Sequence, residues 1–317
     1  MALNNISNKI IISYDEIEIR GGLCVMKSAG KVIGFTNCNE KSFEDIYNAK
    51  REITPDDIAS HVCQFFATTI DGEMSFPICF GGHKSNHYEF ITKKMTEIRD
   101  QFKRTSYGDY VLEVVGGCSD GLAGNYQYAT SHTNENYVHL FDWSHLLKRL
   151  RNCLLKGDDL IIEKEFFYEY IIEDSNVISG IEQSKQIGCC ALAKYLTLMQ
   201  QIHQIFDDER CSNWNEKKQL IESVLTTLKE WKDASSNIIS DELYSHIVMT
   251  MTSLRSLFEK YGNHTQIKAC GISTLIVEHF FSLIRGKIRY PNFRDYCGIY
   301  RAVWIALKTK LVKKFSN

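Results

Sequence analysis

The sequence predicts an α/β protein with a mixed sheet, flanking helices and an all-helical segment inserted late in the chain. Three observations support this fold class. Apolar, strand-like runs fill residues 9–19 and 61–83. Strand-like and helix-like segments then alternate through residues 86–155. Residues 158–268 have helical spacing almost throughout, and glycine and proline are nearly absent there. Short antiparallel strands followed by alternating strands and helices are typical of an α/β sheet.

Composition and length are those of a globular protein. The 317 residues suffice for one large domain or two ordinary ones, and contents of 44% hydrophobic and 24% charged residues are usual for such proteins. We find no run of 18 apolar residues and no signal-peptide core near the N-terminus. The 11 cysteines are scattered without a CxxC pair, which favours reduced thiols. We therefore expect a soluble intracellular protein that does not cross a membrane.

The first part of the chain is expected to form antiparallel strands. Residues 9–19 (KIIISYDEIEI) have the isoleucine-rich pattern of a strand. The runs 23–27 and 31–37 would extend it into a three-stranded meander. Residues 61–82 predict a hairpin, because the Asp71–Gly72 turn separates two apolar runs.

A helix and two further strands are expected next. Residues 86–104 have apolar side chains at helical spacing. The runs 111–115 and 137–141 are strand-like, and 143–155 returns to helical spacing. This order matches a ribonuclease-H-like sheet, in which three antiparallel strands are extended by parallel ones.

The change of pattern near residue 157 predicts three segments. Residues 1–157 would be the first part of the core and 158–268 a helical insertion domain. Residues 269–317 would return to the core as its final helices, with Glu278 in an apolar helix and a basic tail behind it.

Four acids have unusual settings: Asp15, Asp120, Asp142 and Glu278 each lie in or at the end of an apolar element. An unpaired charge there would cost several kcal/mol, so a positive partner is expected. For any single acid, a lysine or arginine is the simpler explanation. Together the four suggest a divalent metal site, because Mg²⁺ prefers oxygen ligands and is held by a few carboxylates. Two such ions can drive phosphoryl transfer.

The histidines argue against a zinc protease motif. His83 and His87 have i, i+4 spacing, but no glutamate lies between them as in HExxH. They fit a loop and a helix start. The sequence also has no GxxxxGK[ST] loop and no dinucleotide-binding glycine pattern. Four more histidines lie near the acids and could either donate hydrogen bonds to the ligands of a metal site or serve in packing: His132, His139, His145 and His279.

Basic residues are concentrated at the C-terminal end. The net charge of −2 does not itself indicate a nucleic-acid partner. Residues 279–317, however, carry nine lysines and arginines against Asp295 alone. Such a segment could bind a phosphate backbone, and a solvated basic helix is the alternative.

Four segments resemble the P-element-type transposases, including their THAP-domain relatives in animals. SYDEIEIRGGLCVMKSAGKVIGFTN resembles the family's opening strand, and VVGGCSDGLAGN its strand ending in Ser-Asp. FDWSHLLKRLRNCL is similar to its Asp-x-x-His-Leu-Leu-Lys segment, and STLIVEHFFSLIRGK to its glutamate helix. The resemblance implies a metal-dependent enzyme of DNA cleavage and strand transfer that works in the nucleus of a eukaryotic host.

Matching motif by motif, the resemblance implies a catalytic triad of Asp15, Asp120 and Glu278 that holds two Mg²⁺ or Mn²⁺ ions. Asp142 is the rival for the second position. Asp120 is preferred because it ends the first strand after the 86–104 helix. Asp142 and His145 would then brace the neighbouring strand end, or contact DNA together with Lys148, Arg149 and Arg151.

The resemblance also implies partners. A homo-oligomeric enzyme would bind double-stranded DNA, at transposon ends and target, through its basic residues. No zinc-coordinating module precedes residue 9, so a separate module or partner would read the DNA sequence. The candidate DNA-binding residues are Lys148, Arg149, Arg151, Arg285, Lys287 and Arg289.

Two departures from the family pattern qualify this reading. The insertion is shorter than in members that use GTP, and Leu275 stands where some members carry an aspartate, which argues against GTP use. Trp143 follows Asp142 where the family often has a small residue or proline. The alternative function is a domesticated or truncated derivative that binds DNA or protein without cutting. A host nuclease of the same fold is a third hypothesis.

Overall fold

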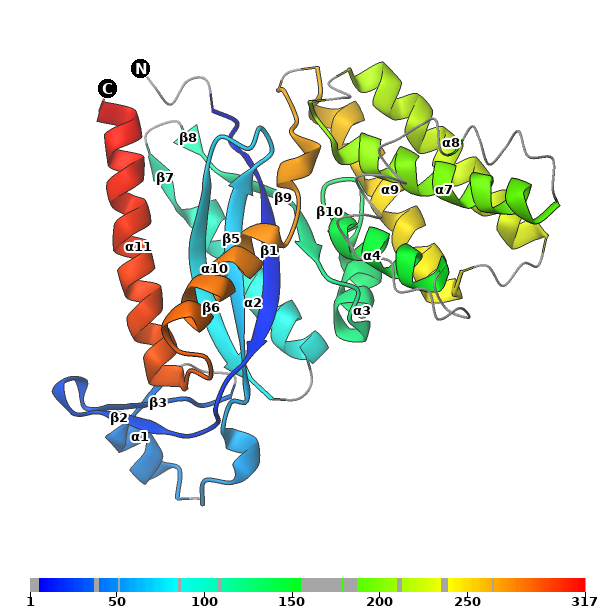
Figure 1. Cartoon of the computed structure of the whole chain (residues 1–317). Helices are drawn as coiled ribbons and strands as arrows, with labels where there is room; N and C mark the ends of the chain where they lie inside the picture. The colour runs from blue at the N-terminus through cyan, green and yellow to red at the C-terminus, as the bar shows by residue number, and fades with distance from the viewer. Residues whose placement is uncertain are drawn as a thin grey trace. The chain divides into compact units, whose positions relative to one another are not determined.

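The computed structural model describes residues 6–36, 40–50, 52–84, 87–107, 110–154, 178, 187–209, 213–234, 239–263 and 265–316. Its main sheet has the strand order β10-β9-β1-β5-β6 (Figure 1). β1 pairs antiparallel with β5 and parallel with β9, and β5 pairs antiparallel with β6. This is the mixed, ribonuclease-H-like sheet that the sequence predicts, and the α/β class is confirmed. The strands are β1 (Lys9–Glu18), β5 (His61–Thr69), β6 (Ser75–His83), β9 (Glu113–Ser119) and β10 (Val138–Phe141).

The chain divides into two compact units. The sheet unit comprises Met1–Tyr137 and Ile272–Asn317, and the helical unit comprises Val138–Gly271. The sheet unit is therefore built from segments far apart in the sequence.

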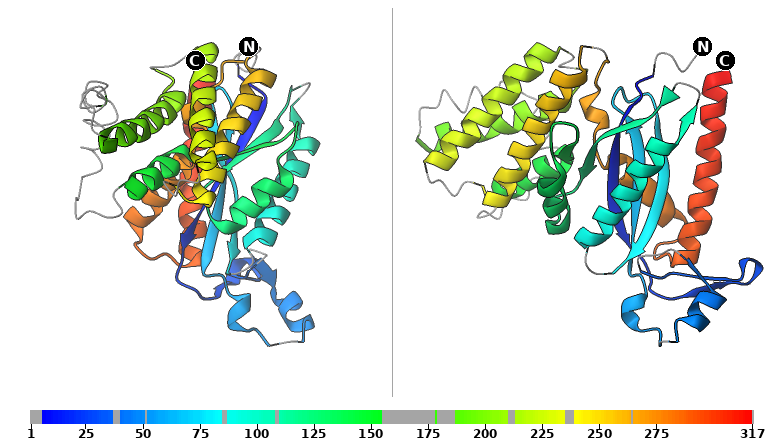
Figure 2. Two further views of the ribbon diagram at one scale, coloured as in Figure 1. Left: turned by 90° about the vertical axis from the view of Figure 1, so that its right-hand side faces the viewer. Right: turned by 180° about the vertical axis from the view of Figure 1, so that it is seen from behind.

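Side chains of β1 alternate between two hydrophobic cores. Ile17 of β1 and Ile19, just after the strand, belong to a core shared with helices α10 (Leu275–Lys287) and α11 (Phe293–Ser316). Ile10, Ile12 and Tyr14 belong to a second core, shared with α2 (His87–Arg104) and α3 (Ala123–His132). Figure 2 shows α2 on the opposite side of the sheet from α10. Because successive residues of a strand point to opposite faces, the parity of a β1 residue tells which helices it faces.

The predicted three-stranded meander is wrong. β2 (Cys24–Met26) and β3 (Lys31–Ile33) pair with each other and with β4 (Glu40–Ser42) in a separate small sheet. Val25 and Met26 are exposed, so β2 has no apolar face to add to the main sheet. β5 takes the place beside β1 because eight of its nine residues are buried, which lets it pack on both cores. The predicted hairpin is confirmed: β5 and β6 are joined through Gly72, whose φ is 69°.

The helices follow the predicted periodicity closely. α2 covers the predicted helix 86–104, and α10 carries Glu278 as expected. The helical unit contains α4 (Trp143–Leu154), α7 (Ile187–Phe206), α8 (Trp214–Asp233) and α9 (Asp241–Tyr261). In that unit α9 packs along β10, where the Phe141 amide donates to the Thr250 hydroxyl at 2.9 Å. The helical pattern expected for 158–186 lies, apart from Ile178, outside the described residues.

The short elements complete the described structure. Among the described residues, no helix is long and apolar enough to cross a membrane. The remaining elements are α1 (Phe43–Asn48), β7 (Ser106–Tyr107), β8 (Tyr110–Val111), and three 3-10 turns at Lys27–Ala29, Pro55–Asp57 and Ala269–Gly271.

Candidate metal centre

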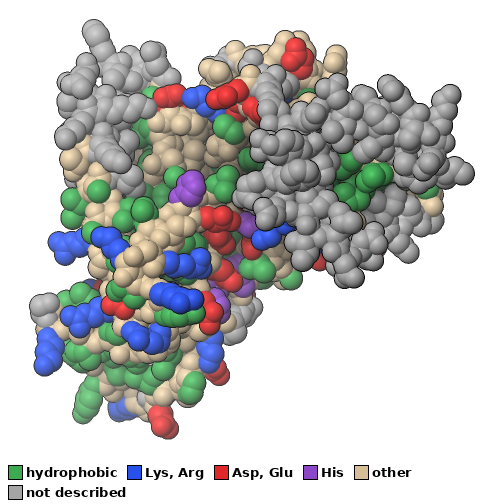
Figure 3. All heavy atoms as spheres, in the orientation of Figure 1, with side chains coloured by type: hydrophobic (Ala, Val, Ile, Leu, Met, Phe, Trp, Pro, Cys, Tyr) green, Lys and Arg blue, Asp and Glu red, His purple; other side chains and the backbone are tan. Residues whose placement is uncertain are grey.

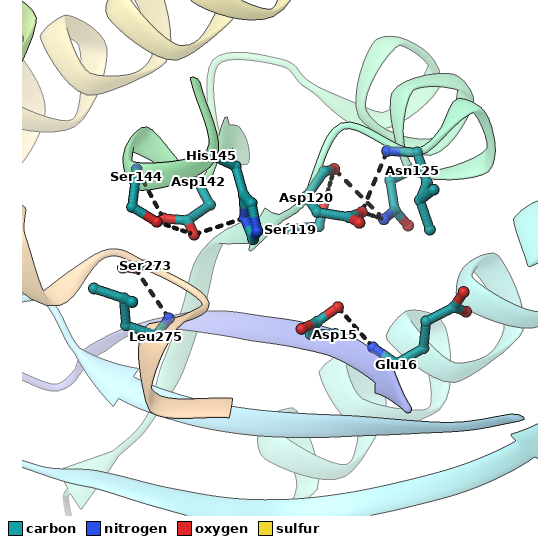
Figure 4. Close-up of polar contacts among 11 residues, drawn as sticks. Asp15, Glu16, Ser119, Asp120, Asn125, Asp142, Ser144, His145, Ser273 and Leu275 are labelled. Atoms are coloured by element: carbon teal, nitrogen blue, oxygen red, sulfur yellow. Dashed lines mark hydrogen bonds and ion pairs between the residues drawn. The ribbon is translucent and has the colours of Figure 1, made fainter. Parts of the chain in front are cut away.

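Asp15 lies near the end of β1 on the face covered by α10. It has the same parity as Ile17, whose side chain packs against that helix, so the Asp15 carboxylate leaves the strand on the same side. The next residue, Glu16, has the parity of Tyr14 and leaves on the α2 side. Figure 4 shows the two side chains directed apart, with the Glu16 amide donating to Asp15 Oδ1 at 2.8 Å. Adjacent acids thus serve opposite faces of one sheet.

Asp120 follows β9 at the same level of the sheet as Asp15. The parallel register pairs Ser13 with Cys118, and each aspartate lies two residues beyond its paired position. Neighbouring carboxyl ends of two parallel strands therefore carry one acid each, with the same parity. The Asp120 Oδ1 atom accepts hydrogen bonds from Asn125 Nδ2 at 2.6 Å and from the Leu122 amide at 3.2 Å. These bonds hold the carboxylate in a tight turn between β9 and α3 (Figure 4).

Glu278 comes from α10, which packs against β1 and β5. The helix buries Val277, Phe280 and Ile284 on the sheet, because these residues recur at helical spacing. Glu278 lies beside that stripe and is partly buried. The packing of α10 thus brings the third predicted acid to the sheet face that carries Asp15.

The three predicted ligands do not form a compact single-ion site. Among the described residues, no group of three ligand atoms within 4.8 Å of one another consists of Asp15, Asp120 and Glu278. Ligands that share two ions about 3.5–4 Å apart are spread more widely than ligands of one ion.

Asp142, the rival of Asp120, lies in the helical unit and is fully buried. Within that unit its carboxylate contacts the first turn of α4. Ser144 Oγ donates to Asp142 Oδ2 at 2.9 Å, and His145 Nδ1 lies 3.0 Å from the same oxygen (Figure 4). The side chain thus caps the start of α4, and the bracing role expected for Asp142 and His145 stays a prediction.

The candidate DNA-binding residues fall into two groups. Arg149 is engaged within the helical unit, where its guanidinium lies 3.1 Å from Glu242 and 3.0 Å from His246 Nδ1. Arg151 donates to Asn152 at 3.2 Å, whereas Lys148 is exposed. The second group is Arg285, Lys287 and Arg289, which are exposed on the sheet unit at the end of α10 and in the loop that follows it. Figure 3 shows lysine and arginine side chains gathered on the surface of this unit.

One cluster was not anticipated from the sequence. Glu16 on the α2 face meets His83, the last residue of β6, and His87, the first residue of α2. Its Oε2 atom lies 2.9 Å from His83 Nε2 and 3.3 Å from His87 Nδ1. Burial would raise the pKa of Glu16, but its bonds to the two imidazoles outweigh burial and hold that pKa well below its usual range. We call this group the Glu16–His83–His87 cluster.

A hydrogen-bond chain joins this cluster to Asp120. His87 Nε2 lies 2.7 Å from Asn125 Oδ1, and the amide of the same asparagine donates to Asp120. Burial would lower the pKa of His87, but its bonds to Glu16 and Asn125 outweigh burial and raise it. The i, i+4 spacing of the two histidines and the Asp15-Glu16 pair were the sequence signals that could have revealed the cluster.

These features define a class of fold: an α/β protein with a ribonuclease-H-like mixed sheet and flanking helices. Among solved structures, the Drosophila P element transposase strand transfer complex is similar, with a TM-score of 0.64 over 95% of this chain and 78% of that chain. The sequences are 14% identical, so the shared feature is the fold. No protein-family model and no curated protein matches the sequence.

Proposed function

We propose that this chain is the catalytic core of a DDE-type DNA transposase, which cleaves DNA strands and joins them to a target. One observation carries the proposal. The parallel pairing of β1 with β9 places Asp15 and Asp120 at neighbouring strand ends, and α10 carries Glu278 on that face. The likeness in fold to a P element transposase supports the same reading.

The donor set fits Mg²⁺ or Mn²⁺. All three candidate ligands are carboxylates, which are hard oxygen donors, and all three are partly buried. A bound pair of such ions would activate a water or a 3′-hydroxyl and stabilise the leaving oxygen.

The residues of the chain have distinct tasks in this proposal. Asp15 and Asp120 hold the ions from rigid strand ends, and Asn125 orients Asp120 through its 2.6 Å hydrogen bond. Arg285, Lys287 and Arg289 are exposed at the end of α10 and would contact DNA phosphates. Because a transposase joins two DNA ends, we expect the chain to act as a homo-oligomer. The likeness in fold to a P element transposase supports action in the nucleus.

Plasmid cleavage tests the catalytic reading. Full-length protein would be incubated with supercoiled plasmid carrying the genomic flanks of its own gene, with Mg²⁺, Mn²⁺ or EDTA. We expect metal-dependent nicking or joining at the flanks that is lost in Asp15→Asn, Asp120→Asn and Glu278→Gln. The matched control is Glu18→Gln, an exposed acid three residues from Asp15 on the same strand, which should keep wild-type activity.

The outcomes separate the candidate functions. Identical activity of wild type and Asp15→Asn would overturn the catalytic proposal. Binding to plasmid without any cleavage would instead identify a domesticated, non-catalytic derivative. Cleavage that ignores the flanking sequence would identify a nuclease of the same fold. If Asp142→Asn abolishes activity while Asp120→Asn retains it, Asp142 is the second ligand.

A further inference from the structure

We propose that the Glu16–His83–His87 cluster is a second metal site, which binds one Zn²⁺ on the opposite face of the sheet from Asp15. The inference does not depend on the proposed function. Its three side chains come from separate elements, β1, the end of β6 and the start of α2. The ligand atoms all lie within 4.8 Å of one another.

The spacing of the donors suits a tetrahedral ion. Ligand atoms bound at about 2.0–2.1 Å in tetrahedral geometry lie roughly 3.3 Å apart. His87 Nδ1 is 3.3 Å and His83 Nε2 is 2.9 Å from Glu16 Oε2. Two of the three donor–donor distances therefore lie within a few tenths of an ångström of that spacing, and the third, between the two histidine nitrogens, is at most 4.8 Å. Two histidines and one glutamate leave a fourth position for water, a donor set that zinc sites use.

Asn125 fixes the tautomer of His87. Its amide nitrogen donates to Asp120, so its oxygen faces His87 Nε2 at 2.7 Å and accepts a hydrogen from that nitrogen. In neutral His87 the other nitrogen, Nδ1, then presents a lone pair toward Glu16. Histidines that bind metals have this arrangement, with one nitrogen on the ion and the other donating to a polar group.

A divalent cation also satisfies His87 without a second proton on its ring. Because His87 Nε2 donates to Asn125, only the imidazolium form of His87 could also donate from Nδ1 to Glu16. His83 can donate to Glu16 from a neutral Nε2–H. A cation between the three donors lets both rings stay neutral.

The histidine rings are already held in place. His83 stacks on Phe90 with ring centroids 4.9 Å apart and an interplanar angle of 25°. The three ligand atoms are buried, whereas Glu16 and His87 keep 24% and 18% of their side chains exposed. The cluster is thus ordered by its surroundings and lies close to the surface.

Metal binding to the full chain tests the proposal. Metal-free protein would be titrated with Co²⁺ as a visible probe and with Zn²⁺ in equilibrium dialysis. We expect d–d absorption bands typical of a tetrahedral site, displacement by Zn²⁺, and one tightly bound Zn²⁺ per chain. His87→Gln and Glu16→Gln should each weaken binding at least tenfold.

Two control variants locate the ion. His61→Gln changes a neighbouring histidine whose ring centroid is 5.6 Å from that of His83 but which is outside the cluster. Asp15→Asn removes a carboxylate from the other face. Both should bind Zn²⁺ like the wild type. If Asp15→Asn loses the ion and His87→Gln keeps it, the Zn²⁺ sits at the carboxylates and the proposal is overturned.

A measurement on the wild-type chain guards against variants that misfold. Zn²⁺ should protect His83 and His87 from modification by diethylpyrocarbonate, as peptide mass spectrometry would show, and should leave His61 and His279 equally reactive. Equal modification of His87 with and without Zn²⁺ contradicts the proposal. Neither result bears on plasmid cleavage, so failure here is distinct from failure of the proposed function.

Discussion

Asn125 donates a hydrogen bond of 2.6 Å from its side-chain amide to Oδ1 of Asp120. The bond ties the first turns of α3 to the end of β9, so the orientation of the carboxylate is set before any ion arrives. Because the asparagine is only 2% exposed, it has little freedom to move away.

This contact predicts the effect of removing Asn125. Asn125→Ala should lower Mg²⁺-dependent cleavage by about 10–100-fold, as loss of partners behind metal ligands does. Raising the Mg²⁺ concentration should restore part of the activity. The control is Asn48→Ala, an exposed asparagine at the end of α1. Initial rates over a Mg²⁺ titration provide the measurement, and an unchanged Mg²⁺ requirement would count against a positioning role.

The two groups of basic residues predict different DNA-binding phenotypes. Let K be the association constant for DNA, which decreases as salt increases. In the double variant Arg285→Ala with Lys287→Ala, the slope of log K against log salt should become less steep by about 2, because each lost phosphate contact removes about one released counterion. Arg149→Ala should keep the wild-type slope, since that guanidinium is held by Glu242 and His246. Fluorescence anisotropy at several salt concentrations measures both. Equal slopes for the double variant and wild type would remove the α10 end from the DNA interface.

Lys217 predicts a large loss of stability in the helical unit. Its side chain is 1% exposed, and its ammonium donates to the Ile205 carbonyl and to Asp208, each at 2.6 Å. Lys217→Met leaves the partly buried Asp208 carboxylate and the Ile205 carbonyl without the ammonium, and should cost about 3 kcal/mol. Lys218→Met changes the next residue, which is half-exposed and 3.8 Å from Glu259, and should cost under about 1 kcal/mol. Urea unfolding compares the two, and similar midpoints would refute the argument.

His246 predicts a pH-dependent stability. Burial is the main cause that lowers its pKa to about 4, and the Arg149 charge adds to it. The unfolded histidine has a pKa of about 6.5, so the unfolded chain binds more protons between these values. Above about pH 6.5 the contribution of His246 to the free energy of unfolding should be constant. From there down to about pH 4, it should lower that free energy by up to about 1.4 kcal/mol per pH unit.

The difference between wild type and His246→Gln isolates this effect from other titrations. Glutamine keeps a polar group near Arg149 but does not titrate. The free energy of unfolding would be measured in urea at several pH values between 4.5 and 7.5 for both proteins. His279→Gln, at an exposed position, is the control and should follow the wild type. Parallel curves for wild type and His246→Gln would mean that His246 is not kept neutral.

Substitution of alanine for glycine should change the stability in opposite directions at two positions. A Cβ atom at Gly82 would lie 2.8 Å from both Ala59 Cβ and Phe293 Cε2, so Gly82→Ala should cost about 1–3 kcal/mol. Gly286 lies inside α10 with nothing within 4 Å, so Gly286→Ala should stabilise by about 0.5–1 kcal/mol. Thermal unfolding distinguishes them. A stabilising Gly82→Ala would mean that α11 does not pack closely on β6.

Local patterns in the sequence were sufficient for most single elements. The isoleucine run of β1, the Gly72 hairpin and the apolar stripe of α10 each depend on residues close together in the chain. The partners of β1 could not be predicted in the same way. Both β5 and β9 lie far from β1 in the sequence, and the pairing of β1 with β5 in place of β2 depends on which strands can bury both faces.

The candidate site has the same limit. Periodicity shows that Asp15 and Glu16 point to opposite faces, but only the packed helices tell which face receives α10 and which receives α2. His83 and His87 do not match the HExxH zinc motif, because no glutamate lies between them. The carboxylate that meets them comes from β1, which no spacing within one helix can reveal. Whether Asp15, Asp120 and Glu278 bind ions stays a prediction.

The order of segments along the chain also has a consequence for synthesis. β1 and β5 can pair as soon as the first third of the protein has left the ribosome, but their face toward α10 and α11 then has no cover. Ile17, Val62 and Phe66 are buried against helices that are made last. The nascent chain therefore presents an open apolar surface through the translation of the whole helical unit, which is a recognised setting for chaperone binding. The helix α10 covers part of that surface and also carries Glu278. A chain in which α10 has not yet packed on the sheet would therefore lack the third acid.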